Sequence, residues 1–295
     1  MINQSKKNQL RFAYGWMALL LLLYVFLRII PIGATFLMSF KKWNLISPKK
    51  PWVGLSNYSK LIADKNFIVA IKNTLVFAFA SVFLTIVFSL LLSVAIQKKF
   101  RGKGLYESLF FIPYVIAVVP ASLAWKFIYD PTNGVLNYVL SWFGIPGQAW
   151  LINDKLILWS IMLTTIWQKI GYDMVIFTVG LGEIPKDYYE ASRVDGANSV
   201  QIFFKITLPL LLPVLVYLTI MNTIDAFNIF TPVFVMTQGT QMAPTAQLRV
   251  LVTEIYQNAF RYFQMGYASA QGVCLFLIVL IVSVLQFVYF KKMEK

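Results

Sequence analysis

Histidine is absent from the 295 residues of this chain, and cysteine occurs once, as Cys274. Without histidine, the chain lacks the side chain most often used for acid–base catalysis near neutral pH and as a metal ligand. A single cysteine excludes an intrachain disulfide bond. The phosphate-binding pattern Gly-x-x-x-x-Gly-Lys-Ser/Thr is also missing. These absences predict a chain that is not an enzyme, has no catalytic or metal-binding residues, and binds no cofactor of its own.

Charged residues are scarce as well. They make up 13% of the chain, whereas 59% of its residues are hydrophobic. Soluble domains contain about 25% charged residues. The hydrophobic residues also gather in long runs, which cross a membrane as helices because a helix satisfies its own backbone hydrogen bonds. We therefore expect an all-α integral membrane protein, organised as a single transmembrane domain over residues 1–295.

Six apolar runs are long enough to span a bilayer. They cover approximately residues 14–40, 70–97, 105–129, 156–180, 208–236 and 265–290. The first run is longer than the core of a signal peptide and has no small-x-small cleavage site after it, so we expect it to be retained. Six spans place both termini on the same side of the membrane.

The net charge of +14 does not indicate a nucleic-acid partner. Most basic residues lie in short loops between the apolar runs, where membrane lipid and insertion topology account for them. The side that holds the termini has slightly more lysine and arginine than the opposite side, and residues 98–103 form its clearest basic loop. Because such loops stay inside, we expect both termini and the loop at residues 183–206 in the cytoplasm.

The loop at residues 183–206 is too polar to span a membrane and has the signals of two short helices. Pro185 suits the first position of a helix, and Asp187 would stabilise the positive end of that helix. Gly196 can adopt the left-handed conformation that ends a helix. Asn198 or Ser199 can cap the helix that follows. These residues predict a helix, a turn and a second helix.

The same loop contains residues at fixed spacings that match a known pattern. The matching residues are Glu190, Ala191, Gly196, Ile206, Leu208 and Pro209. The pattern resembles the EAA loop of permease subunits in binding-protein-dependent type I ABC importers, with Ser192 in place of the usual second alanine. In that family the loop forms a cytoplasmic coupling helix that docks into an ATPase. The resemblance therefore implies an ATPase-coupling role for Glu190, Ala191, Ser192 and Gly196.

Two further segments resemble signatures of the carbohydrate branch of these permeases, which imports maltose and other sugars. One joins Val-Gly-Leu-Ser-Asn-Tyr at residues 53–58 to Asn-Thr-Leu at residues 73–75. The other joins Met-Thr-Gln-Gly at residues 236–239 to residues 255–270, which end in Gly-Tyr-Ala-Ser-Ala. The resemblance covers nearly the whole chain and implies import of a sugar or oligosaccharide across a bacterial cytoplasmic membrane.

Polar residues within the spans are candidates for the transport path, because burying them in lipid is costly. Lys169 and Asp173 lie four residues apart in the fourth run, and we expect them to form a structural ion pair. Asn222, Asp225 and Asn228 are spaced three apart in the fifth run and gather on one helix face. The corresponding span lines the central cavity in the family. We therefore place these three residues, together with Asp173, in the substrate path.

Arg28, in the first run, has no acidic neighbour in the sequence. We expect it either to pair with Asp173 or Asp225 or to lie at the interface with a companion subunit. With Lys169, it balances the two acids, which favours an uncharged solute over a phosphate ester.

The resemblance also implies several partners. They are a second homologous permease subunit, two cytoplasmic ABC ATPase subunits that hold ATP and Mg²⁺, and an extracellular or periplasmic solute-binding protein. Residues 41–72 contain seven lysines but a single acid, Asp64. This external segment is either a solvated loop or a docking surface for an acidic binding protein.

Three alternatives remain at this stage. The same architecture could import glycerol phosphate or another small polar solute. An ion-driven secondary transporter would also have several spans, but it would not explain the EAA pattern and often has an internal repeat, which we do not find here. An intramembrane enzyme would depend on a pair such as Lys169 and Asp173. The sequence identifies neither the solute, nor the ATPase, nor whether the companion permease is a second copy of this chain.

Overall fold

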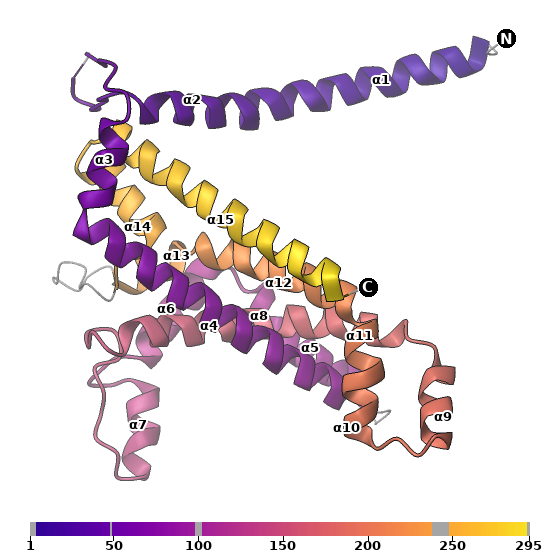
Figure 1. Ribbon diagram of the computed structural model, residues 1–295. Helices are drawn as coiled ribbons and strands as arrows, with labels where there is room; N and C mark the ends of the chain where they lie inside the picture. Colours follow the sequence, from indigo (N-terminus) through magenta and orange to yellow (C-terminus); the bar gives the residue numbers. More distant parts are fainter. Residues whose placement is uncertain (1–3, 48, 98–101, 238–247, 294–295) are drawn as a thin grey trace. The chain divides into compact units, whose positions relative to one another are not determined.

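The computed structural model describes residues 4–47, 49–97, 102–237 and 248–293 (Figure 1). Within these residues the chain is helical, apart from one isolated antiparallel bridge between Lys41 and Trp52. The chain divides into two compact units. The first consists of Met1–Asp64 and Ile255–Cys274, and the second consists of Lys65–Glu254 and Leu275–Lys295.

The first unit contains helical segments from both of its stretches of sequence. They are α1 (Gln4–Tyr24), the π-helical segment η1 (Val25–Ile29), α2 (Ile30–Ser39), α3 (Ser56–Ala63), the end of α14 (Leu251–Tyr256), the π-helical segment η4 (Gln257–Arg261) and the first part of α15 (Met265–Met293). Pro31 lies directly after η1 within one continuous helical segment, Gln9–Ser39, and removes a backbone hydrogen-bond donor there.

The two sugar-branch signatures have a structural role within this unit. The Asn57 side chain donates hydrogen bonds to the carbonyls of Ser39 (2.7 Å) and Lys41 (3.1 Å), and the Tyr58 hydroxyl lies 2.6 Å from the Ser39 hydroxyl. These bonds fix α3 against the end of α2. A Cβ atom at Gly266 would overlap the carbonyl of Lys41, so only glycine permits this approach. Residues 238–247, which include the end of the 236–239 signature, lie outside the described residues, as do residues 98–101 of the basic loop.

The second unit holds the longer series of helices. They are α4 (Lys65–Ile96), α5 (Lys103–Val115), α6 (Val118–Ile128), α7 (Val135–Trp142), α8 (Ile157–Gly182), α9 (Lys186–Val194), α10 (Ser199–Ile202), the π-helical segment η2 (Phe203–Thr207), α11 (Leu208–Leu210), α12 (Leu212–Phe227), α13 (Thr231–Thr237), the beginning of α14 and the remainder of α15. In this unit α7 and α9 lie at opposite ends of the α4–α8 bundle (Figure 1).

Four helical segments in the described part of the chain are long and apolar enough to cross a membrane. They are Gln9–Ser39, Lys65–Ile96, Leu212–Thr237 and Met265–Lys292, and the bent pair α5–α6 makes a fifth if it counts as one span. Length and composition therefore identify four or five spans. The sequence-based count of six, and the single domain over the whole chain, stay predictions.

The run at residues 105–129, which the sequence predicted as one span, is not a single continuous helix. It is divided into α5 and α6, which are bent by 96°. Ile116 and Ala117 have extended backbone at the break, and Pro113 removes a hydrogen-bond donor in the last turn of α5. The Gln168 side chain donates to the carbonyl of Ile116 (2.9 Å) and satisfies part of the interrupted backbone. The run at residues 208–236 is likewise interrupted, between α12 and α13.

The core of the second unit forms where α4 packs along α8. The Ser89 hydroxyl donates to the carbonyl of Ile170 (3.0 Å), which joins the last third of α4 to the middle of α8. Gly171 allows α8 to approach α5 closely, because a Cβ atom at this position would overlap the carbonyl of Phe110. An apolar cluster packs between the last turns of α4, the last turns of α8 and the residues around the start of α12. Its buried members are Leu90, Phe177, Leu181, Ile184, Leu211 and Leu218.

The segment around α7 begins with a turn at Asp130. The Asp130 carboxylate accepts hydrogen bonds from the backbone N–H of Asn133 (2.8 Å), the hydroxyl of Thr132 (2.7 Å) and the backbone N–H of Thr132 (2.9 Å). These bonds stabilise the charged form and lower the pKa of Asp130 below its ordinary value. The turn therefore directs the chain out of α6 and into α7 without a regular connecting helix.

Asn137 holds the rest of this segment together. Its Nδ2 donates to the carbonyls of Pro131 (3.1 Å) and Gln148 (2.9 Å), and its Oδ1 accepts from the backbone N–H of Gln148 (3.0 Å) and from Nε1 of Trp150 (2.8 Å). The side chain is buried, so each of these bonds is protected from water. One amide thus connects the turn before α7 to the segment that follows it.

Replacing Asn137 with alanine is expected to loosen residues 131–150 locally. The change leaves the carbonyls of Pro131 and Gln148 and the Trp150 N–H without their partner, at a cost of about 1–3 kcal/mol for each group that stays buried. Hydrogen–deuterium exchange should rise in this segment and stay unchanged in α4. Alanine at Asn133, an exposed residue, is the matched control, and equal exchange in the two variants would contradict this role of Asn137.

Candidate functional site

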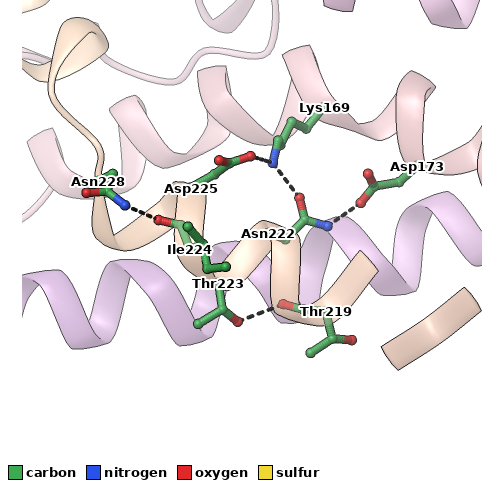
Figure 2. A network of polar contacts seen from close by, with 8 residues as sticks. All are labelled: Lys169, Asp173, Thr219, Asn222, Thr223, Ile224, Asp225 and Asn228. Atoms are coloured by element: carbon green, nitrogen blue, oxygen red, sulfur yellow. Dashed lines mark hydrogen bonds and ion pairs between the residues drawn. The ribbon is translucent and has the colours of Figure 1, made fainter. Parts of the chain in front are cut away.

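A connected polar network joins α8 to α12 inside the second unit (Figure 2). Lys169 Nζ donates a hydrogen bond to Oδ1 of Asn222 (2.7 Å) and forms an ion pair with Oδ2 of Asp225. Asn222 Nδ2 in turn donates to Oδ2 of Asp173. Asn222 therefore uses both ends of its amide to link the lysine to the second acid.

The members of this network differ in their access to solvent. Asp173 is 1% exposed and Asn222 is 4% exposed. The Lys169 side chain is 26% exposed, and the Asp225 side chain is 57% exposed. Asp173 Oδ1 has no hydrogen-bond partner in the described part of the chain. The network thus runs from an open carboxylate, through a partly covered lysine, to a fully buried acid.

The open end of the network lies in a cavity of about 250 Å³. The cavity is lined by α4, α8, α12, the segment that joins α12 to α13, the start of α13 and Val118 of α6, with the rings of Phe77 and Phe230 in its wall. Its uncharged polar lining residues other than Asn222 are Ser81, Thr85, Thr165, Gln168, Asn228 and Thr231. Hydroxyl and amide groups beside aromatic rings can bind a polar ligand that also has apolar faces. No metal-binding group of three or more His, Cys, Asp or Glu side chains occurs among the described residues.

Three of the four residues assigned to the substrate path line this cavity. They are Asn222, Asp225 and Asn228, and the Asn228 side chain also donates to the carbonyl of Ile224 (2.7 Å). The fourth, Asp173, is buried behind Asn222 and is not part of the lining. A role for these residues in transport stays a prediction.

The expected ion pair between Lys169 and Asp173 is wrong. Lys169 pairs with Asp225 on the neighbouring helix, and Asp173 is bound by Asn222 instead. The flexible lysine side chain reaches across to α12, where it gains two partners rather than one. Arg28 is exposed in η1 of the first unit, and its expected pairing with Asp173 or Asp225, or its place at an interface with a companion subunit, stays a prediction.

Sequence reasoning missed the contribution of α4 to the cavity. Ser81 and Thr85 are buried polar residues in the apolar second half of α4, and Ser89 continues the same four-residue spacing. A polar stripe at this spacing occupies one face of a helix, so the pattern could have indicated a lined path. No such signal marks the aromatic residues of the wall.

The second candidate site is the helix–turn–helix of α9 and α10. Gly196 has a φ angle of +79°, in the left-handed region. The backbone N–H of Ala197 bonds to the Ser192 carbonyl (3.0 Å), and that of Gly196 bonds to the Arg193 carbonyl (3.1 Å), which together form a Schellman motif. Asn198 caps α10 in a capping box with Gln201. Of the two caps that the sequence offered, the structure thus uses Asn198.

α9 turns one face inward and leaves the other in solvent. Tyr189 packs against the apolar cluster, and Ser192 is buried with its hydroxyl donating to the Tyr189 carbonyl (2.9 Å). Glu190 and Ala191 are exposed, and Val194 is 88% exposed. The small residue Ser192 therefore permits close packing within the chain itself, while the outward face of α9 is free in this chain to meet a partner.

Comparison with known families identifies the architecture around these sites. Residues 89–295 match the family model described as binding-protein-dependent transport system inner membrane component. This match includes α8, α9, α10 and α12, which carry the polar network and the helix–turn–helix, but not the α4 residues that line the cavity.

Whole-chain comparisons agree with the family match. The chain is 35% identical over 277 residues to the probable ABC transporter permease protein YesP of Bacillus subtilis (strain 168), covering 93% of this chain and 88% of that protein. It is 30% identical over 272 residues to the trehalose/maltose transport system permease protein MalF of Thermococcus litoralis, covering 91% and 90%. A solved bacterial ABC transporter involved in import of the acidic polysaccharide alginate has the same fold, with a TM-score of 0.86 at 22% identity over 99% of this chain and 100% of that one. The chain therefore belongs to the family of inner membrane components of binding-protein-dependent transport systems.

Proposed function

We propose that this chain is one of two permease subunits of an ATP-driven ABC importer, and that the pair encloses the path for a sugar or oligosaccharide. The observation that carries the choice of solute is the cavity between α4, α8 and α12. It combines hydroxyl and amide groups with two aromatic rings, and the two charged residues among its described lining residues, Lys169 and Asp225, form an ion pair. The similarity to a trehalose/maltose permease supports this choice.

The six-span topology is part of the proposal. α8 has 26 residues, which rise about 39 Å and exceed the apolar thickness of a bilayer of about 30 Å. Its composition is less apolar because Gln168, Lys169 and Asp173 lie near its middle, and these are the residues that face the cavity or the network. A helix that lines a polar path does not need an entirely apolar surface. With α8 and the bent pair α5–α6, the chain has six crossings and both termini in the cytoplasm of a bacterial cell.

Energy for transport comes from partners in this proposal. Two cytoplasmic ABC ATPases bind ATP and Mg²⁺, and one of them contacts the exposed face of α9, which includes Glu190 and Ala191. Ser192 packs on the buried face of α9, and Gly196 ends the turn that follows this helix. ATP-driven closure of the ATPases moves α9, and through the apolar cluster moves α8 and α12, so that the cavity alternates between the two sides.

The solute reaches the path from a binding protein on the outer side. One solved structure with this fold is an alginate ABC transporter in complex with a pentasaccharide-bound periplasmic protein. In the present chain, the lysine-rich segment at residues 41–72 offers positive charge for such a partner. Glycerol phosphate fits the cavity less well, because its dianion would meet a lysine that Asp225 already occupies.

Side-specific labelling tests this function. With Cys274 replaced by serine, we expect a cysteine at Glu190 to react with a membrane-impermeant maleimide only in inside-out vesicles, and to cross-link to a copurified ATPase. A cysteine at Ser141, in α7 at the other end of the bundle, is the matched control and should react on intact cells. Reaction of the residue-190 cysteine on intact cells would contradict the proposed topology, and with it the coupling role.

A further inference from the structure

The cavity between α4, α8 and α12 has an unequal distribution of charge. Among the described residues that line it, Lys169 and Asp225 are the only charged ones. They form an ion pair, but Asp225 is 57% exposed whereas Lys169 is 26% exposed. A ligand in this cavity therefore meets the carboxylate more readily than the ammonium group, although the pair is neutral as a whole.

The bonding of the two groups reinforces this difference. Lys169 already donates to Asn222 and to Asp225, and its amine has three donors in all. The carboxylate of Asp225 has two oxygens that can accept about four hydrogen bonds. Within the described residues, the lysine is the only group bonded to that carboxylate. Asp225 thus keeps most of its capacity to accept hydrogen bonds, while Lys169 has one donor left.

We propose that Asp225 determines the charge selectivity of the transport path. Its carboxylate accepts hydrogen bonds from the hydroxyl groups of a neutral sugar, and it covers the lysine that would otherwise attract an anion. A carbohydrate acid is rejected, because its carboxylate would approach the carboxylate of Asp225 in a partly dehydrated cavity. This inference rests on the proposed sugar-permease function and assigns to one residue the discrimination between neutral and acidic sugars.

Substitutions at the pair should change the selectivity in a defined order. Asp225→Asn keeps the size of the side chain but leaves Lys169 as an uncompensated cation, so the cavity should become attractive to anions. Asp225→Glu keeps the charge and should resemble the parent protein. The double variant Lys169→Gln, Asp225→Asn removes both charges and should return the cavity close to neutrality. Asp173 is buried behind Asn222 and is the same in all variants.

A thiol placed in the cavity measures its charge directly. Thr231 lines the cavity and is partly exposed, so Thr231→Cys in a Cys274→Ser background gives one reactive thiol. The full chain is purified in detergent with its accompanying subunits and treated with cationic and anionic methanethiosulfonate reagents. In the Asp225→Asn variant, the ratio of the cationic to the anionic rate should fall about tenfold, because a charged cleft changes the local ion concentration by this order. Asp225→Glu should stay within about twofold of the parent ratio.

Protection of the same thiol tests selectivity for sugars. Labelling with uncharged N-ethylmaleimide is measured with maltotriose or with trigalacturonate, a neutral and an acidic trisaccharide. We expect maltotriose to slow labelling of the thiol in the parent protein. Trigalacturonate should slow this labelling only in the Asp225→Asn variant. A reagent ratio that does not change in Asp225→Asn, or equal effects of trigalacturonate on the two proteins, would overturn the proposal. Failure of the proposed function is distinguishable, because it would appear as the absence of a copurified ATPase, whatever the reagent ratio.

Discussion

Replacing Gly196 with valine is expected to abolish the response of the cavity to ATP while the permease still folds. Gly196 has a φ of +79°, and a non-glycine residue in this conformation costs about 1–2 kcal/mol. Space does not limit the substitution, because a Cβ atom at Gly196 would meet nothing within 4 Å. The strain is relieved by moving the end of α9 or the start of α10, which changes the surface offered to the ATPase. Coupling between two sites typically changes the binding affinity at one of them by about 5- to 150-fold, and a loss of coupling removes this change.

The measurement compares the labelling rate of the Thr231→Cys thiol with and without MgATP in the purified complex. Gly144→Val is a matched control, because Gly144 also has a positive φ (+67°) and open space around its Cβ position, but follows α7 at the other end of the bundle. The control should carry the same local strain and keep the response to MgATP. A Gly196→Val complex that retains the response, or a control that loses it equally, would refute the coupling role of this turn.

The turn between α9 and α10 could be predicted from sequence because its signals are local. Asp187 lies in the first turn of α9, Gly196 is left-handed and Asn198 caps the next helix, as expected. Each of these residues acts on backbone within three or four positions of itself, so spacing along the chain contains the needed information. The burial of Ser192 was not predictable in this way, because it depends on which face of α9 the apolar cluster covers.

The polar network could be predicted only in part, for a related reason. Asn222, Asp225 and Asn228 were placed on one face from their spacing, and all three line the cavity. The partner of Lys169 was misassigned because spacing reveals neighbours on the same helix and not those on the helix packed beside it. The bend of α5 and α6 was missed because an apolar run has the same composition whether it is straight or broken. Pro113 was the available signal, since proline interrupts a helix.

The structure also separates residues that the sequence treated as equivalent. Asp225 and Asn228 are exposed to the cavity, whereas Asn222 is buried and joins Lys169 to Asp173. Substitution of the first two should therefore act on solute recognition. Substitution of Asn222 should act on the packing of α8 against α12, before any effect on transport can be measured.

Replacing Asn222 with leucine is expected to destabilise the permease strongly. Leucine has nearly the same size, but it removes the only hydrogen bond made to the Asp173 carboxylate within the described residues and one acceptor of Lys169. Leaving a buried carboxyl group without its hydrogen bond costs about 1–3 kcal/mol, and more when the group is charged. The variant should therefore show a lower thermal transition in detergent and a smaller yield of assembled complex. Asn228→Ala, which changes an exposed side chain bonded to its own helix, should shift the transition little.

A second substitution decides whether the loss comes from the unpaired acid. Replacing both partners of a buried polar pair with apolar residues of similar size is often nearly neutral, because no group remains without its hydrogen bond. The double variant Asn222→Leu, Asp173→Leu should therefore recover most of the thermal stability that Asn222→Leu loses. Lys169 keeps its ion pair with Asp225 in both proteins, so the cavity retains its charge balance. If the double variant were less stable than Asn222→Leu, the amide of Asn222 would not act by satisfying Asp173, and the link between the open and the buried ends of the network would have another basis.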